Sequence, residues 1–201
     1  HNGNTFTYNP VPQNEWKTKE HQYFLEGRLE FLDTEGEWFL DTTTPKNTLY
    51  YYAPSGANPN QMQIRGKVQS YAFVISKSKY VELRDLEFFG TTFYIYKSNG
   101  SKVDNCNFFY PSTSKRMLRI VNQVPEMSII KSSSGCTVSN SAFRYTDGSA
   151  IEAWGGNNTI KNNYFYHIDY SSADLTSIMV TVLMSGKYNK FQYNTMHKLG
   201  A

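Results

Sequence analysis

Glu152 and Trp154 are the two residues in this sequence whose types and spacing are best suited to act together. They lie two positions apart in the apolar segment 150–154, and side chains two apart on a β-strand project from the same face. A Trp ring can lie against the apolar face of a pyranose, and a carboxyl group whose pKa is raised by desolvation can serve as a general acid or base. The pair therefore indicates a carbohydrate site.

Hydrolysis of a glycosidic bond needs a second carboxyl group, about 5–5.5 Å from the first in retaining enzymes and farther away in inverting ones. Asp147, Asp169 and Asp174 flank the neighbouring segments and are the candidate partners. We therefore take Glu152, Asp147 and Asp169 as candidate catalytic residues. The alternative is that Glu152 is a solvated strand residue and that the aspartates only form turns.

Basic side chains indicate a second reaction, the β-elimination of a uronic-acid polymer. This reaction needs the substrate carboxylate neutralised by Ca²⁺ or Arg, and a base that removes the proton on C5. Lys77 and Lys97 are expected on adjacent repeats, where like charges repel unless an anion lies between them. His167 could be oriented by Asp169, although a structural role is the alternative. Arg116, Arg119 and Arg144 lie near inserted loops, and the candidate substrate-binding residues are Trp154, Lys77, Lys97, Arg144 and His167.

The composition excludes several other classes of function. Twenty basic against 17 acidic residues give a net charge of only +3 without a basic stripe, so no nucleic-acid partner is predicted. No apolar run reaches eighteen residues, so no membrane insertion is predicted. The sequence contains no His/Cys metal spacing, phosphate loop or nucleophile elbow. We predict no metal site and no cofactor, with Ca²⁺ entering only if the protein is a lyase.

Five segments repeat one pattern and predict the elements that position these residues. Each has an apolar residue at its first position and another five residues later, and four of the five carry Asn or Asp at the third position. A tight Gly/Ser/Asn turn precedes nearly every copy. Short strands and turns at a period near 22 residues are typical of a parallel β-solenoid, with a β-sandwich as the alternative. The segments begin at Leu83, Val103, Val138, Ile160 and Phe191.

Equivalent residues of a solenoid stack about 4.8 Å apart. Asn140 and Asn162 are therefore expected to hydrogen-bond across coils and to satisfy groups that would otherwise be buried unpaired. An alignment without gaps places Val74, Tyr94, Ile129, Ile151 and Val182 in one column, which we take to face inward. Glu152 then faces outward, and Ile75, Ile95 and Ile130 would need loops to cover them. Such loops would form a groove for an extended polysaccharide. An interior stack of aromatic rings is expected from Phe88, Phe108, Phe143 and Phe165.

The motif apolar-x-Asn-x-x-Phe after a Gly/Asn turn resembles the repeat of the pectate-lyase-like superfamily over about residues 62–201. This resemblance implies an all-β fold, a right-handed parallel β-helix. It implies little about function, because lyases, hydrolases, epimerases and phage tailspikes share the fold. The stretch 23–54 looks like a region of large secreted β-helix proteins linked to glycan breakdown. In that group a segment like 193–200 is followed by further coils, so we expect this chain to be a fragment.

The expected organisation is an N-terminal capping region, residues 1–61, followed by β-helix coils in residues 62–201. Segments 37–41 and 48–52 read as a hairpin, and a cap is expected because a solenoid end exposes unpaired strand edges. Cys106 and Cys136 occupy different offsets in their coils, so no disulfide is expected between them. The sequons at Asn99 and Asn157 are candidate glycosylation sites and are compatible with a secreted or cell-surface protein.

From these features we expect a secreted protein that binds or degrades a polysaccharide, as a glycoside hydrolase or a polysaccharide lyase. The alternative is a structural or adhesive solenoid without enzymatic activity, since a stiff rod with a Tyr-, Asn- and Ser-rich surface suits a fibre or surface coat. Whether the protein turns over a substrate is left open.

Overall fold

A computed structural model describes residues 27–113, 127–169 and 182–199. The chain divides into two compact units, residues 1–64 and 65–201. The first unit contains an antiparallel hairpin in which Trp38 lies opposite Tyr51 and Asp41 opposite Thr48, so the predicted hairpin is confirmed. Its role as a cap stays a prediction. The elements of this unit are η2 (Leu29–Phe31), β1 (Trp38–Asp41), β2 (Thr48–Tyr51) and η3 (Pro59–Gln61).

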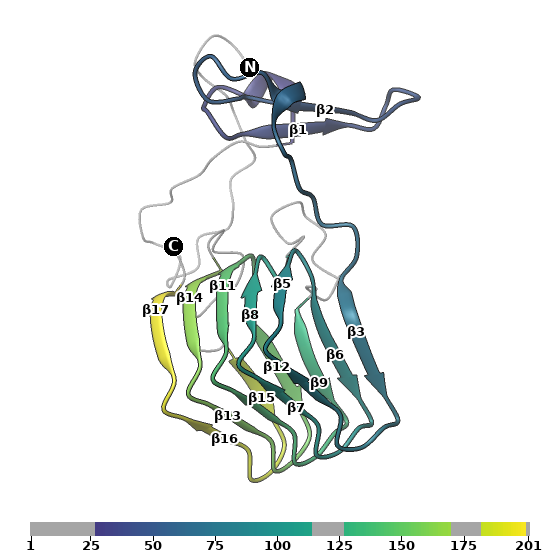
Figure 1. Cartoon of the computed structure of the whole chain (residues 1–201), viewed down its shortest axis with the longest axis vertical. Coiled ribbons are helices and arrows are strands. Elements are labelled where there is room, and N and C mark those ends of the chain that lie inside the picture. The colour runs from purple at the N-terminus through teal and green to yellow at the C-terminus, as the bar shows by residue number, and fades with distance from the viewer. Residues whose placement is uncertain (1–26, 114–126, 170–181, 200–201) are drawn as a thin grey trace, which may run out of the picture. The chain divides into compact units, whose positions relative to one another are not determined.

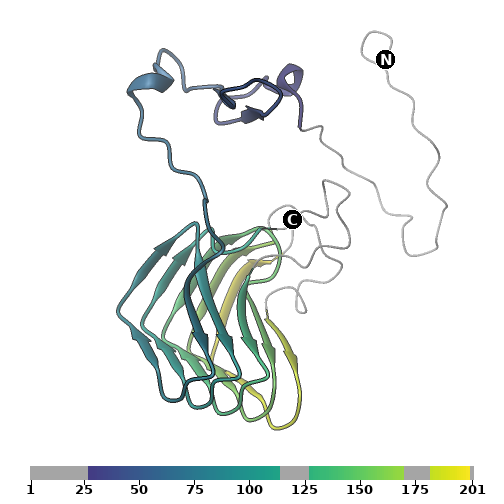
Figure 2. The same ribbon diagram turned by 90° about the vertical axis from the view of Figure 1, so that its right-hand side faces the viewer.

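The second unit is a parallel β-helix. Its strands form three parallel sheets of five strands each, and consecutive strands along the chain belong to different sheets (Figures 1 and 2). The prediction of an all-β parallel β-helix is therefore confirmed. The first sheet contains β3 (Tyr71–Ser76), β6 (Thr92–Tyr96), β9 (Ser128–Lys131), β12 (Ile151–Trp154) and β15 (Val182–Ser185). The second contains β4 (Glu82–Arg84), β7 (Lys102–Asp104), β10 (Thr137–Ser139), β13 (Thr159–Lys161) and β16 (Lys190–Gln192). The third contains β5 (Glu87–Phe89), β8 (Asn107–Phe109), β11 (Ala142–Thr146), β14 (Tyr164–Ile168) and β17 (Thr195–Leu199).

A stack of phenylalanine rings runs through the interior, as the repeat predicts. Phe88, Phe108, Phe143 and Phe165 are buried, and neighbouring ring centroids are 4.5, 4.5 and 5.4 Å apart with nearly parallel planes. Because the register pairs each Phe with the next, the repeat spacing of the sequence becomes a continuous apolar column.

The Asn/Asp column lies at the sharp corner between the second and third sheets. Asp85, Asn105, Asn140 and Asn162 all have φ between 51° and 56°, a left-handed conformation that Asn and Asp tolerate better than most residues. Asn162 donates to Asn140 Oδ1 at 2.6 Å, which confirms the predicted stacking. These side chains are exposed, so the expectation that their amides satisfy buried groups is wrong. Their backbone conformation explains the residue type.

A second set of polar side chains satisfies the buried turns instead. Asn163 is buried; its Oδ1 accepts from the Ser141 N–H at 2.9 Å and its Nδ2 donates to the Val138 carbonyl at 3.0 Å. Asn158 makes the same two hydrogen bonds at the corner between the first and second sheets. It accepts from the Cys136 N–H and donates to the Ser133 carbonyl. Side-chain amides thus replace strand pairing where the chain turns inside the protein.

The expected column alignment on the first sheet is wrong by one residue from β12 onward. Ile129 pairs with Glu152 and not with Ile151, because the turn containing Gly155 and Gly156 is one residue shorter than its equivalent in the preceding coil. The inward column therefore contains Ile75, Ile95 and Ile130, which are buried in the core. No covering loops are needed there, so this argument for a groove fails.

Both cysteines are buried and free, which confirms that Cys106 and Cys136 form no disulfide. The Cys106 Sγ lies 3.3 Å from the Asp104 carbonyl, and the Cys136 Sγ lies 3.2 Å from the Ser98 carbonyl. Each thiol therefore occupies its own inner corner of the β-helix as a small side chain that contacts backbone oxygen.

Candidate functional site

Glu152 and Trp154 project outward from β12. Burial alternates along this strand: Ile151 and Ala153 are fully buried, Glu152 is half-buried, and Trp154 exposes 45% of its surface. The pleat of a β-strand produces this alternation. The expectation that the pair shares one outer surface is therefore correct, even though the column alignment that led to it was not.

Aromatic and basic side chains surround the pair on the outside of the first sheet. Lys131 lies opposite Trp154 in the register, with its Nζ 5.9 Å from the centroid of the indole ring, and Tyr96 lies opposite Lys131 on the next strand. The rings of Tyr71 and Tyr94 stack with centroids 5.3 Å apart, and those of Tyr94 and Tyr96 with centroids 6.0 Å apart. We call this surface the Trp154 face; it comprises Tyr71, Tyr94, Tyr96, Lys131, Glu152 and Trp154.

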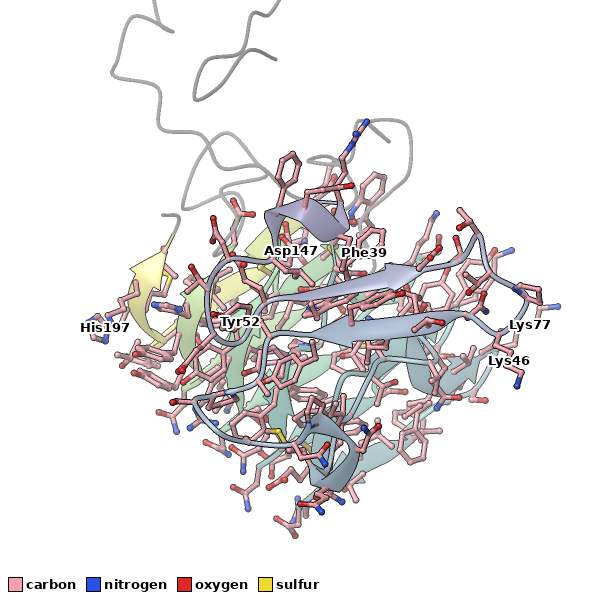
Figure 3. The ribbon with its side chains drawn as sticks, turned by 90° about the horizontal axis from the view of Figure 1, so that it is seen from above. Phe39, Lys46, Tyr52, Lys77, Asp147 and His197 are labelled. Atoms are coloured by element: carbon pink, nitrogen blue, oxygen red, sulfur yellow. The ribbon has the colours of Figure 1, made fainter. Side chains whose placement is uncertain are left out.

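The candidate carboxyl partners of Glu152 come from the third sheet. Asp147, labelled in Figure 3, directly follows β11 and is half-buried. Asp169 directly follows β14, is buried, and donates its N–H to Thr146 Oγ1 at 3.1 Å. Within the described residues, Glu152 is the one carboxylate at an outward position of the first sheet. Asp174, Arg116 and Arg119 lie outside the described residues.

Lys77 and Lys97 lie on adjacent coils, directly after β3 and β6. Both are exposed and both adopt a left-handed backbone, with φ of 52° and 48°. The Nζ of Lys97 lies 5.1 Å from the ring centroid of Tyr96, so Lys97 borders the Trp154 face. An anion between the two lysines stays a prediction.

Arg144 and His167 belong to a different surface from Glu152 and Trp154. Arg144 lies on β11 and His167 on β14, and both strands are part of the third sheet. The guanidinium group of Arg144 lies 5.3 Å from the ring centroid of Phe109 and 5.7 Å from that of Tyr164. Sequence spacing assigns a residue to a coil but not to one of its three faces. The single substrate site drawn from the sequence therefore separates into two surfaces.

Both glycosylation sequons lie at the corner between the first and second sheets. Asn99 and Asn157 are exposed, and each hydrogen-bonds to Ser134: the Ser134 N–H donates to Asn99 Oδ1 at 2.9 Å, and Asn157 Nδ2 donates to Ser134 Oγ at 3.3 Å. Their modification stays a prediction.

The described residues contain no group of three or more His, Cys, Asp or Glu side chains arranged to hold a metal ion. The role of Ca²⁺ in a lyase reaction stays a prediction. In the described part of the chain, no helix is long and apolar enough to cross a membrane.

Lys131, Tyr94 and Tyr96 belong to the Trp154 face but were not predicted there from the sequence. The gapless alignment placed Tyr94 in the inward column, whereas the structure turns it outward with Glu152 and Ile129. The adjacent glycines at 155 and 156 were the signal that could have corrected this, since they mark a turn that differs from its equivalents in other coils.

Comparisons with protein families, with curated proteins and with solved structures found no match for this chain. The architecture itself defines the class of protein, a parallel β-helix protein with aromatic and charged side chains on its outer faces. Membership of the pectate-lyase-like superfamily stays a resemblance of the repeat.

Proposed function

We propose that this protein is a secreted or cell-surface β-helix protein that binds an extended polysaccharide along the Trp154 face. The observation that carries the proposal is the position of Trp154, which is 45% exposed and shares an outward strand face with Glu152. Large aromatic rings are normally buried, and an exposed one beside polar groups suits a ligand with one apolar and one hydroxylated side.

The geometry of the sheet favours an extended ligand. Outward side chains repeat from coil to coil at about 4.8 Å, so Tyr96, Lys131 and Trp154 form a row along the β-helix axis. A sugar chain running along this row would meet rings and a hydrogen-bonding cation in turn. Ring stacking would supply most of the affinity, and Lys131 and Glu152 would orient the hydroxyl groups.

We extend the proposal to catalysis through Glu152, as the acid or base of a glycoside hydrolase or a polysaccharide lyase. The position of Glu152 supports this role, because its carboxyl group is half-buried and projects from the same outer strand face as Trp154, within reach of a sugar stacked on the indole ring. A hydrolase would need Asp147 or Asp169 as the second carboxyl group, and a lyase would need Ca²⁺ or a basic side chain at the substrate carboxylate.

A structural or adhesive rod is the second candidate. The observation that favours it is the continuity of the ladders, since the Phe88 to Phe165 ring stack and the amide bond from Asn162 to Asn140 link successive coils. Such repetition stiffens a solenoid whatever the protein binds.

Two substitutions on the Trp154 face test the proposal. Trp154→Ala should weaken binding of oligosaccharides about tenfold or more, because it removes a stacking surface worth about 1–3 kcal/mol. Tyr193→Ala is the matched control, since Tyr193 is 84% exposed but lies at the corner between the second and third sheets. Affinities should be measured by titration calorimetry against neutral and uronate-rich polysaccharides.

Glu152→Gln separates binding from catalysis, because it keeps the shape of the side chain but removes its titrating proton. Loss of turnover with retained binding would identify Glu152 as an acid or base. If Glu152→Gln keeps full activity, the catalytic part of the proposal is wrong. If Trp154→Ala and Tyr193→Ala bind equally well, the Trp154 face is not the glycan site.

A further inference from the structure

The outer surface of the third sheet carries basic side chains set among aromatic rings in three of its coils. We call this surface the cation–aromatic strip. It does not overlap the Trp154 face, because its residues all come from β11, β14 and β17 of the third sheet. Figure 3 labels His197, which lies on β17. The strip comprises Arg144, Tyr164, Tyr166, His167, His197 and Lys198.

Arg144 is held in place at one end of the strip. Its guanidinium group contacts the rings of Phe109 and Tyr164, and its Nη1 donates to Asn107 Oδ1 at 3.1 Å. A guanidinium group has five N–H donors in a fixed plane, and such stacking fixes the direction in which the others point. Arg144 is therefore preorganised to donate further hydrogen bonds.

Tyr166 connects the remaining members. The register places it between Arg144 on one side and His197 on the other. Its ring centroid lies 6.0 Å from that of Tyr164, 5.1 Å from that of His167 and 5.5 Å from that of His197, and the Lys198 Nζ lies 5.7 Å from it. Arg144 and His197 therefore lie two coils apart in one column, about 10 Å along the β-helix axis. His167 and Lys198 lie on adjacent coils in the neighbouring column.

The formal positive charges of the strip, on Arg144 and Lys198, take part in no ion pair within the described residues. No carboxylate occupies an outward position of β11, β14 or β17, and none of the four basic side chains takes part in a described ion pair. Asp147 and Asp169 follow their strands at the next corner, and Asp169 is buried there. Glu87 faces outward on β5, at the other end of the sheet.

The second sheet shows the opposite arrangement. On its outer surface Arg84 lies 2.6 Å from Glu82 Oε1 and 3.5 Å from Asp104 Oδ2, so its cation is paired within the protein. Among the residues that the structure describes, a cation is thus paired with acids on the second sheet, whereas Arg144 and Lys198 form no ion pair on the third. The unpaired set indicates a negatively charged ligand.

The backbone supports a specific role for these side chains. Tyr110, Tyr145, His167 and Lys198 have φ of 53°, 59°, 54° and 56°, whereas the equivalent position of the first coil is Gly90 with φ of 67°. A large side chain costs free energy in this conformation and a glycine does not. Four successive coils thus present an aromatic or basic side chain where glycine would be the least strained residue.

We propose that the cation–aromatic strip binds the anionic substituents, carboxylate or sulfate, of a glycan chain that runs along the β-helix axis. The faces of Tyr164 and Tyr166 contact each other and the neighbouring cations, so they offer no free platform for a stacked base. Recognition would come from Arg144, His167, His197 and Lys198, with the phenol groups as hydrogen-bonding partners. This proposal stands on the third sheet alone and does not depend on the Trp154 face.

The test is a binding titration at two salt concentrations with wild-type chain and charge-changing variants. The probes are polygalacturonate for carboxylate, dextran sulfate for sulfate, and dextran as the neutral polymer. Arg144→Gln should weaken binding of the preferred anionic polymer about tenfold or more, because it removes charge-assisted hydrogen bonds. Lys198→Gln, at an exposed residue, keeps the test valid if Arg144→Gln fails to fold. Lys161→Gln is the matched control, since it removes one positive charge from exposed β13 on the second sheet.

Arg144→Lys refines the test, because it keeps the charge but not the planar fork. We expect it to restore only part of the affinity. Binding of an anionic polymer that weakens with salt, is reduced by Arg144→Gln or Lys198→Gln, and is unchanged by Lys161→Gln would support the proposal. The tighter of the two anionic polymers would then identify the substituent.

The proposal is overturned if no anionic polymer binds, or if Lys161→Gln weakens binding as much as the strip variants do. It is also overturned if dextran binds as tightly as the anionic polymers and only Trp154→Ala reduces that binding. This last result would leave the function proposed for the Trp154 face intact, so the two proposals fail separately.

Discussion

Replacing Asn163 by Ala should destabilise the β-helix far more than any change at the exposed Asn column. Asn163 is buried, and Ala removes the acceptor of the Ser141 N–H at 2.9 Å and the donor to the Val138 carbonyl at 3.0 Å. Each buried group that loses its partner costs about 1–3 kcal/mol, so we expect a loss of about 2–5 kcal/mol. Asn163 has no positive φ, so backbone strain adds nothing to this figure.

Asn140→Gly is the matched control. It also removes two side-chain hydrogen bonds, to Asp104 and from Asn162, but these are exposed to solvent and water can replace them. Glycine also fits the φ of 53° at this position without strain. We therefore expect a cost below about 1 kcal/mol.

Urea unfolding followed by circular dichroism measures both values, provided that the dependence on urea concentration stays the same in each variant. Amide hydrogen exchange at Ser141 gives a local check, since its N–H should lose protection in Asn163→Ala. A free energy of unfolding for Asn163→Ala within about 0.5 kcal/mol of wild type would refute the reasoning. An equal loss in Asn140→Gly would refute it as well.

Three further predictions concern the core, the thiols and one carboxylate. Phe143→Ala should lower the free energy of unfolding by about 3–5 kcal/mol, because it opens a cavity in a buried ring stack. Phe89→Ala, at an exposed position, should cost much less. Equal losses of the two variants in urea unfolding would contradict this prediction. Burial raises the pKa of the Cys106 and Cys136 thiols, so neither should react with a thiol reagent until the protein unfolds, and rapid labelling of native protein would argue against their burial. Hydrogen bonds from Ser139 and then Asn140, together with Arg84, lower the pKa of Asp104 despite partial burial. The contribution of the ionised Asp104 carboxylate to stability should therefore be full at neutral pH and decrease below about pH 4. The difference in melting temperature between wild type and Asp104→Asn should then shrink on acidification. A difference that stays constant would contradict the lowered pKa of Asp104.

The repeat could be predicted from the sequence because its two strongest constraints act on single residues. A buried stack needs an apolar side chain at the same place in every coil, and Phe143 and Phe165 meet that need. A sharp corner needs a residue that tolerates positive φ, and Asn140 and Asn162 meet it. Both constraints recur at fixed offsets, so the pattern survives loops of different length.

The register of the first sheet could not be predicted in the same way. A turn can lose one residue without changing the strands on either side, and the shorter turn at Gly155 moved Glu152 opposite Ile129. One residue is enough to exchange the inward and outward faces of a strand. The assignment of Ile130 to a covered outer surface failed for this reason.

The division of the candidate site also lay beyond the sequence. Glu152 and His167 are fifteen positions apart, which places them in the same coil, but a coil has three faces and the intervening corners decide which one a residue occupies. A left-handed position within β14 gives His167 a φ of 54°, and its ring lies against those of Tyr145 and Tyr166. No spacing rule for a single strand contains that information.

One row of backbone N–H groups, at the corner between the first and second sheets, donates in one direction along the chain. The N–H of Ser98 donates to Ser133 Oγ, that of Cys136 to Asn158 Oδ1, and that of Asn158 to Asn189 Oδ1, across 35, 22 and 31 residues. In each case the acceptor belongs to the later coil. During synthesis, the amide of each such turn therefore lacks its protein acceptor until the ribosome has added the next coil. The last coil formed at any moment always exposes amides of this kind. Each new coil completes the one before it, so folding on the ribosome should proceed as an ordered addition from the N-terminal coil onward.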